Sequence, residues 1–93
     1  MITAVVLITA ERGALPKLGE ELAAVPGVSE VYSVTGQIDF IAMVRAREHD
    51  ELADIVTQRI GQVPGVVRTQ THVAFRMYSR HDLESVFGLG GPQ

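Results

Sequence analysis

The chain repeats one short pattern 38 residues apart, and this repeat constrains its fold more than any other feature. The sequence Val-Pro-Gly-Val at residues 25–28 recurs at residues 63–66, and an aliphatic residue, Leu22 or Ile60, stands three positions before each copy. The same shift aligns two apolar runs at the beginnings of the two copies. Each copy reads as an apolar strand, an amphipathic helix, a Pro-Gly turn and a second strand. The sequence therefore predicts two consecutive β-α-β units.

Two such units in 93 residues predict one α+β domain of the ferredoxin-like βαββαβ type. Its expected architecture is a four-stranded antiparallel sheet with two helices on one face. We expect strands over residues 2–9, 28–35, 39–44 and 66–77, with a tight turn at Gly36-Gln37. The apolar faces expected of the two helices are Leu15, Leu18, Leu22 and Val25, and then Leu52, Ile55, Val56 and Ile60.

The C-terminal residues read as a segment separate from this domain, so we divide the chain into a domain over 1–78 and a tail over 79–93. Ser79 and Asp82 have the spacing of a helix N-cap box. A short helix is expected there, followed by a flexible glycine-rich end. Such a short helix is only marginally stable by itself, so it should dock on its own or on a neighbouring subunit. Its apolar side chains are Leu83, Val86 and Phe87.

Composition excludes several classes of function. The formal net charge is −3, and the 8 basic residues are scattered rather than gathered on one face, so direct DNA binding is not expected. The chain has no cysteine, which excludes disulfides and thiolate metal or redox sites. It shows no secretory signal and no apolar run long enough to cross a membrane, so we expect a soluble cytoplasmic protein.

Both faces of the two expected central strands are apolar. A four-stranded sheet with helices on one side should be polar on its open side. Here the first strand has Val5 and Leu7 on the face opposite Ala4 and Val6, and the third strand repeats this pattern. We therefore expect a second subunit to cover the open face, and the alternative is that the C-terminal tail covers it.

No arrangement of residues points to catalysis or to a metal. His49, His72 and His81 fall on a helix start, a strand and the tail, without the spacing of metal ligands. The chain contains none of the nucleophile or phosphate-binding motifs, and no cofactor is expected.

The hairpin at residues 34–40 is the segment that most suggests ligand binding. The turn at Gly36 exposes backbone N–H groups, and the carboxylate of Asp39 follows three positions later. These two groups suit the carboxylate and the ammonium of a free amino acid. Thr69 and Thr71 on the fourth strand could add hydroxyl groups. In the alternative interpretation, Asp39 only ties down the hairpin and the threonines are ordinary strand residues.

Three segments together resemble a known family. Residues 34–39, Val-Thr-Gly-Gln-Ile-Asp, resemble the G-x-Y-D segment of the Lrp/AsnC ligand-binding domain, also called the RAM domain. Residues 64–71 resemble its G-V-x-x-T-x-T strand, and residues 22–28 also fit. The resemblance covers residues 2–77 and rests on the order and spacing of these motifs.

The resemblance implies dimers formed through the sheets and assembled further into octamers or decamers. It also implies an amino-acid effector held between dimers, and no enzymatic activity. By position, Gly36, Gln37 and Ile38 would supply backbone contacts and Asp39 would be the acid. The side chains of Thr69 and Thr71 would lie nearby.

Two departures bear on this resemblance. Ile38 stands where the family often has an aromatic residue, which puts the pocket wall and the effector in question. The chain also lacks the helix-turn-helix of full-length regulators, so it resembles a stand-alone RAM protein. Regulation would then act through effector binding or through mixed oligomers with full-length relatives.

Two other functions are compatible with the same fold. One is a small dimeric α+β barrel enzyme, a monooxygenase or isomerase, with His72 as acid or base in a cavity beside Tyr32 or Phe40. The other is a structural oligomerisation module that binds no ligand.

Overall fold

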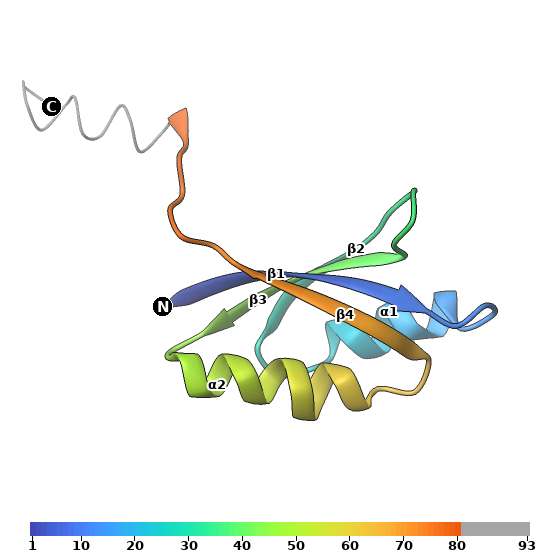
Figure 1. The fold of residues 1–93 in the computed structure, drawn as a ribbon. Coiled ribbons are helices and arrows are strands. Elements are labelled where there is room, and N and C mark those ends of the chain that lie inside the picture. The colour runs from blue at the N-terminus through green and yellow to red at the C-terminus, as the bar shows by residue number, and fades with distance from the viewer. Residues whose placement is uncertain (81–93) are drawn as a thin grey trace, which may run out of the picture.

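The computed structural model describes residues 1–80, which form a four-stranded antiparallel sheet with its helices on one face (Figure 1). This confirms the predicted ferredoxin-like fold. The strand order is β2-β3-β1-β4, so β1 and β3 are central. The predicted tail helix lies almost entirely outside the described residues. The elements are β1 (Ile2–Ala10), α1 (Leu15–Ala23), β2 (Val28–Ser33), β3 (Phe40–Ala46), α2 (His49–Asp54) and β4 (Val66–Val73).

The two copies of the repeat have the same local structure. Val25 N–H donates to Leu22 O at 3.1 Å, and 38 residues later Val63 N–H donates to Ile60 O at 3.1 Å. The next hydrogen bonds, from Val28 and Val66 to the valines before the prolines, are 3.0 and 3.2 Å long. The repeated sequence thus encodes a repeated turn that ends each helix and starts the following strand.

The glycine of each turn packs against the opposite half of the molecule. Gly27 and Gly65 have φ angles of +98° and +101°, which favour glycine. A Cβ atom at Gly27 would overlap Ile55 Cδ1, and one at Gly65 would lie 3.1 Å from Ala14 Cβ. Because each glycine lacks a side chain, a residue of the other repeat packs directly against each turn. Ile55 of the second helix packs against Gly27, and Ala14, just before α1, packs against Gly65.

The second helix changes its pitch to keep its apolar side chains in the core. After α2 the chain makes a wide π-helical turn over Ile55–Arg59 and a tight 3-10 turn over Ile60–Gln62. The N–H of Ile60 donates to the carbonyl of Ile55, five residues back. Five residues would carry a side chain away from its face in a regular α-helix, but across this turn both Ile55 and Ile60 are fully buried.

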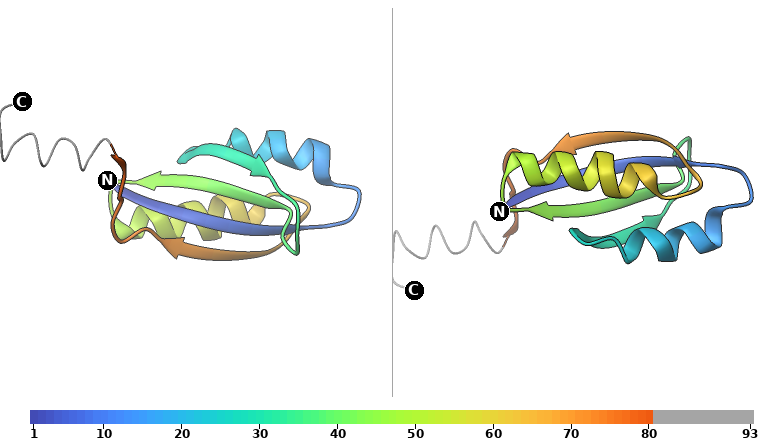
Figure 2. Two further views of the ribbon diagram at one scale, coloured as in Figure 1. Left: turned by 90° about the horizontal axis from the view of Figure 1, so that it is seen from above. Right: turned by 90° about the horizontal axis from the view of Figure 1, so that it is seen from below.

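The core lies between the sheet and the two helices, and Figure 2 shows α1 alongside β2 at one edge of the sheet and α2 behind β1 and β4. The alternate residues of β1 and β3 that face the helices are buried, as period-two alternation requires. One predicted core residue is wrong: Leu15 is 41% exposed, since it begins α1 at the margin of the sheet. The core consists of Ala4, Val6, Ile8, Leu18, Leu22, Phe40, Ala42, Val44, Ala46, Leu52, Ile55 and Ile60.

Strand β4 ends earlier than the sequence suggests. We expected it to continue to Met77, but it ends at Val73. Its neighbour β1 begins at Ile2, and the last bond between them runs from Ala74 N–H to Thr3 O at 2.8 Å. The chain beyond Ala74 has no strand to pair with, and it rises from the side of the sheet opposite the helices (Figure 1).

Candidate functional site

The open face of the sheet has an apolar centre, as the sequence predicts. Leu7 lies between Ile41 on β3 and Gln70 on β4, and Val5 lies between Met43 and His72. The four apolar side chains in these two rows are only half-buried, because no element of residues 1–80 covers them. Water-facing apolar side chains at the centre of a sheet indicate a surface that another chain can cover.

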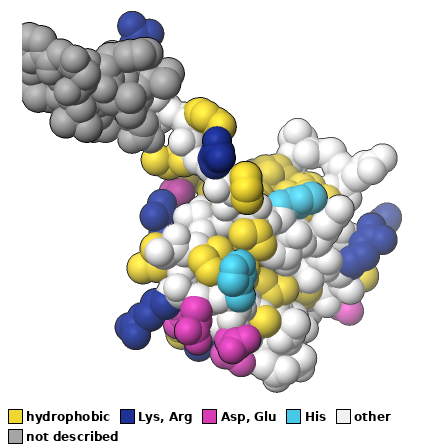
Figure 3. Space-filling model, turned by 60° about the vertical axis from the view of Figure 1, so that its left-hand side comes forward, with side chains coloured by type: hydrophobic (Ala, Val, Ile, Leu, Met, Phe, Trp, Pro, Cys, Tyr) yellow, Lys and Arg dark blue, Asp and Glu magenta, His cyan; other side chains and the backbone are white. Residues whose placement is uncertain are grey.

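The segment after β4 extends this apolar surface. Phe75, Met77 and Tyr78 are 92%, 75% and 76% exposed. Figure 3 shows hydrophobic side chains along this segment and continuing onto the body of the molecule at its base. The segment and the open face therefore form neighbouring apolar surfaces on one side of the sheet.

The hairpin between β2 and β3 stands at the other end of the open face (Figure 1). It is wider than the two-residue turn that we predicted, because Val34 N–H donates to Asp39 O at 3.1 Å and encloses residues 35–38. Gly36 has a φ of +109°, and both Gly36 and Gln37 are exposed. Their backbone groups are therefore accessible to a ligand or to a neighbouring subunit.

Asp39 anchors this hairpin to β1. Its Oδ2 atom accepts a hydrogen bond from Ala10 N–H at 2.7 Å, and its own N–H donates to Ile8 O at 2.9 Å. The side chain therefore has the structural role that one of our two sequence interpretations assigned to it. Asp39 also lines a shallow hollow with Ala10, Glu11, Arg12, Gly13 and Leu15.

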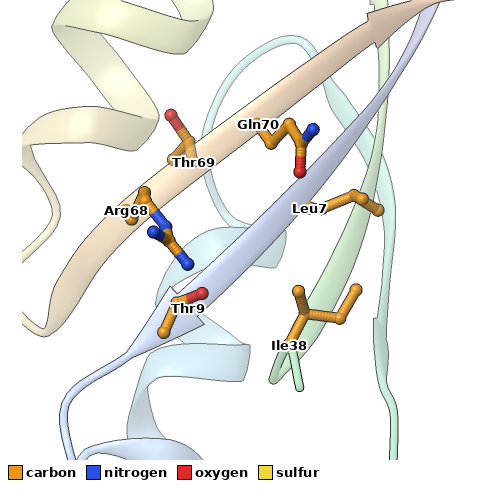
Figure 4. A pocket seen from close by; sticks show the side chains of 6 residues that line it. All are labelled: Leu7, Thr9, Ile38, Arg68, Thr69 and Gln70. Carbon is orange, nitrogen blue, oxygen red and sulfur yellow. The ribbon is translucent and has the colours of Figure 1, made fainter. Parts of the chain in front are cut away.

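A small polar pocket lies on the open face beside the hairpin (Figure 4). Its volume of about 20 Å³ has room for about one water molecule and is far below the range of roughly 300–1,000 Å³ typical of ligand sites. It is open to solvent, so a neighbouring molecule could add a further wall. The lining residues are Leu7, Thr9, Ile38, Arg68, Thr69 and Gln70.

The structure brings together only some of the residues that the sequence suggested. Ile38 and Thr69 line this pocket, whereas Asp39 lines the adjacent hollow. Thr69 pairs with Ile8 and Thr71 with Val6, so both threonines lie on the helix-facing side of β4. Figure 4 accordingly shows Thr69 pointing away from Leu7 and Ile38, at the margin of the pocket.

Sequence reasoning missed the residues of β4 that do face the pocket. Arg68 pairs with Thr9 and Gln70 pairs with Leu7, which places all four on the open face. Alternation along β4 separates these residues from the two threonines, and this signal is present in the sequence. Choosing between the two sets requires the register against β1, which the sequence alone does not supply.

The charges on the open face are unevenly paired. Tyr32 Oη donates to Glu30 Oε2 at 2.8 Å on the edge strand β2. This bond and the nearby negative charge raise the pKa of Tyr32 above its ordinary value. The side chain of Arg68, by contrast, has no ion-pair or hydrogen-bond partner within residues 1–80.

The three side chains of the alternative enzyme site lie apart in residues 1–80, because His72 is on β4 and Tyr32 is on β2, the two edge strands of the sheet. His72 lies on the open face opposite Val5, whereas Phe40 is buried on the helix side. No three His, Asp or Glu side chains among residues 1–80 lie close enough to hold a metal ion. No helix in the same residues is long and apolar enough to span a membrane.

The fold and the hairpin with its adjoining pocket point to a family of ligand-binding domains. Residues 3–83 match the family described as the Lrp/AsnC ligand binding domain. The chain belongs to this family.

Two of the similar proteins of known sequence are named as HTH-type transcriptional regulators. The chain is 38% identical over 59 residues to an HTH-type transcriptional regulator of Pyrococcus furiosus, an alignment that covers 63% of this chain and 39% of that protein. It is 29% identical over 75 residues to the HTH-type transcriptional regulator FL11 of Pyrococcus horikoshii, covering 81% and 49%. The chain thus spans half or less of the length of these regulators.

Solved structures agree with the fold. A crystal structure of a protein from Thermus thermophilus has a TM-score of 0.80 and 51% identity, and covers 86% of this chain and 100% of that one. Escherichia coli AsnC has a TM-score of 0.76 and 20% identity, covering 84% of this chain and 55% of AsnC, and supports the fold alone.

Proposed function

We propose that this chain is a non-enzymatic effector-binding and oligomerisation module of the Lrp/AsnC regulators, and that its effector is an amino acid. The observation that carries the proposal is the pocket between the hairpin and β4 in a member of this family. The lining combines hydrogen-bonding side chains with an aliphatic wall, so it could form one side of a site for a small polar molecule that has an apolar side chain.

The proposed binding residues are those of the hairpin and of β4. Gly36, Gln37 and Ile38 offer backbone groups, and Asp39 is the acid for the ammonium. Thr69 and Thr71 are the further candidates from the sequence. Because the pocket is small and open, we place the effector between this surface and a neighbouring subunit, which encloses it.

The proposed assembly is a homodimer built by pairing two open sheet faces, with dimers assembling further into an octamer or decamer. Its support is the half-buried apolar centre of the open face and the exposed segment beside it. An effector enclosed between subunits would favour the assembly that binds it better, and this linkage couples effector concentration to oligomer size.

The proposed setting is the cytoplasm, without direct contact to nucleic acid or membrane. A regulatory output would then pass through mixed assemblies with full-length relatives that carry a DNA-binding domain. Co-expression of tagged chain with such a relative, followed by affinity purification, tests this step, and recovery of homo-oligomers alone would contradict it.

A thermal shift assay of the purified protein against all twenty amino acids tests the proposed function. A ligand at a hundred times its Kd adds about 2.7 kcal/mol to stability. For a chain of this length that corresponds to a rise in Tm of roughly 10 °C or more. We expect one amino acid or a few related ones to give this rise. A flat panel would contradict effector binding and favour the structural oligomerisation module.

Two substitutions at Asp39 separate binding from folding. Asp39→Ala should abolish the ligand-induced shift, but it also removes the acceptor for Ala10 N–H and lowers the basal Tm. Asp39→Asn keeps an oxygen acceptor at this position and removes the negative charge. We expect Asp39→Asn to lose the ligand-induced shift with a smaller drop in basal Tm. An unchanged shift in both variants would remove Asp39 from the site.

A further inference from the structure

We infer that residues 75–78 pack against the edge strand β2 of a second copy of this chain, with Arg76 beside Glu30 of the partner subunit. This inference rests on the proposed pairing of two open sheet faces, and it adds the contacts that orient one subunit on the other. Large apolar side chains exposed to water indicate a surface that another chain covers. Those of this segment are Phe75, Met77 and Tyr78, and they are 92%, 75% and 76% exposed.

The segment leaves the sheet in the direction of a facing subunit. Strand β4 ends at Val73, and Ala74 N–H donates to Thr3 O at 2.8 Å. Beyond this bond the chain rises on the side of the open face (Figure 1). Two sheets packed face to face are about 10 Å apart, and four extended residues span roughly 13 Å. Residues 75–78 are therefore long enough to reach the edge of a sheet that covers the open face.

The two edges of the open face differ in charge. One row of paired side chains crosses this face from Glu30 on β2 to His72 on β4, and Met43 and Val5 lie between them. Glu30 is the one charged residue in β2. Strand β4 contains Arg68 in addition to His72, and it contains no acid. The β2 edge is therefore acidic, whereas the β4 edge is basic.

Two-fold symmetry allows two ways to place one open face on another. When the axis runs along the strands, β4 of each subunit lies over β2 of the other. When the axis runs across the strands, β4 lies over β4 and β2 over β2. Both arrangements bring the apolar centres of the two faces together, because β1 and β3 are the central strands. Only the first brings edges of opposite charge together.

Arg76 favours the first arrangement. The segment continues from the end of β4, so it meets the partner's β2 in the first arrangement and the partner's β4 in the second. On β2, Arg76 lies near Glu30, whose Oε2 atom accepts from Tyr32 Oη at 2.8 Å and whose Oε1 atom has no donor within residues 1–80. On β4 it would lie near Arg68, which has the same charge. Arg76 itself lies over the ring of Phe75, 5.7 Å from its centroid, and has no ion-pair partner within residues 1–80.

Cross-linking of single cysteines distinguishes the two arrangements. The chain has no cysteine, so Ser29→Cys beside Glu30 and Met77→Cys beside Arg76 introduce the only thiols. Both positions are exposed, and the Arg76–Glu30 contact is retained. The two full-length variants carry different tags, are co-expressed, and are treated with a short bismaleimide.

We expect a cross-link between the two variants, from position 29 of one subunit to position 77 of the other. Each variant expressed alone should stay uncross-linked. Gln58→Cys, exposed on the helix layer, replaces Ser29→Cys as the matched control and should give no cross-link to position 77. Cross-links from 29 to 29 or from 77 to 77 would place like edges together and overturn the inferred arrangement.

Charge variants test the contact between Arg76 and Glu30. Because symmetry repeats this contact in each dimer, Arg76→Gln or Glu30→Gln should raise the dimer Kd by about 2- to 30-fold at low salt. Glu30→Arg should weaken the dimer further, and adding Arg76→Glu to it should recover part of the loss. Analytical ultracentrifugation measures the Kd, and circular dichroism verifies that each variant is folded.

The outcomes distinguish this inference from the proposed function. A dimer with an unchanged or lower Kd after neutralisation would overturn the Arg76–Glu30 contact and leave the proposed assembly standing. An unsubstituted chain that is monomeric would contradict both the assembly and this contact. Amino-acid binding is measured separately by the thermal shift assay, so its presence or absence does not depend on these variants.

Discussion

Gly27 lies where the two halves of the repeat meet, and its lack of a side chain allows them to approach. Its φ of +98° is unfavourable for any L-residue with a Cβ atom, and that atom would overlap Ile55 Cδ1. Gly36 has a similar φ of +109° but nothing within 4 Å of the position that a Cβ would take. Comparing substitutions at Gly27 and Gly36 therefore separates the free energy lost to a strained backbone from the free energy lost to overpacking.

We predict that Gly27→Ala lowers the free energy of unfolding by about 2–4 kcal/mol, the sum of left-handed strain and overpacking. Gly36→Ala should lower it by only about 1 kcal/mol, from the strain alone. Urea unfolding followed by circular dichroism, at one protein concentration throughout, measures both. Equal losses would mean that Ile55 moves aside without cost and that the close contact is not a constraint.

Within α1, the two leucines of the predicted apolar face differ in how much they contribute to packing against the sheet. Leu18 is 1% exposed and Leu15 is 41% exposed, although both belong to the apolar spacing that predicts the helix. We predict a loss of about 2–5 kcal/mol for Leu18→Ala, and less than about 1 kcal/mol for Leu15→Ala. Thermal and urea unfolding of the two variants measure this difference. Similar losses would place Leu15 in the core after all.

The elements show which information the sequence contains. The Val-Pro-Gly-Val turns, the helix faces and the order of the strands follow from residue type and spacing, so they could be predicted. The end of β4 could not, because it depends on where its neighbour β1 begins. The π-helical turn at Ile55–Arg59 could not be predicted either. Its structure does explain how Ile55 and Ile60, five residues apart, are both buried in the core.

The candidate site shows the same limit more strongly. The glycine turn and Asp39 could be found as local signals, and the pocket does adjoin the hairpin that they define. The side chains opposite the hairpin depend on register, and a shift of one residue exchanges Thr69 and Thr71 for Arg68 and Gln70. The local sequence pattern therefore located the site, whereas identifying the side chains that line it required the register between β1 and β4.

At the scale of the whole molecule, the open sheet face decides whether the chain acts alone. Ile41 lies at its centre, between Leu7 and Tyr32, and is half-buried. If two such faces pack together, Ile41→Glu places a charge in an apolar interface, where it has no partner and its desolvation is costly. In a separate subunit the same carboxylate remains accessible to water, so the fold is retained.

We therefore predict that Ile41→Glu shifts the protein to a folded monomer at micromolar concentration. Leu15→Glu is the matched control, because it adds the same charge at an exposed position on α1, in the helix layer. It should leave the assembly unchanged. Size-exclusion chromatography with light scattering gives the mass, and circular dichroism verifies the fold.

Monomers for Leu15→Glu but not for Ile41→Glu would move the interface to the helix layer. An unsubstituted protein that is itself monomeric would contradict assembly through either layer. In that case the pocket beside the hairpin would have to bind its ligand without a neighbouring subunit to enclose it.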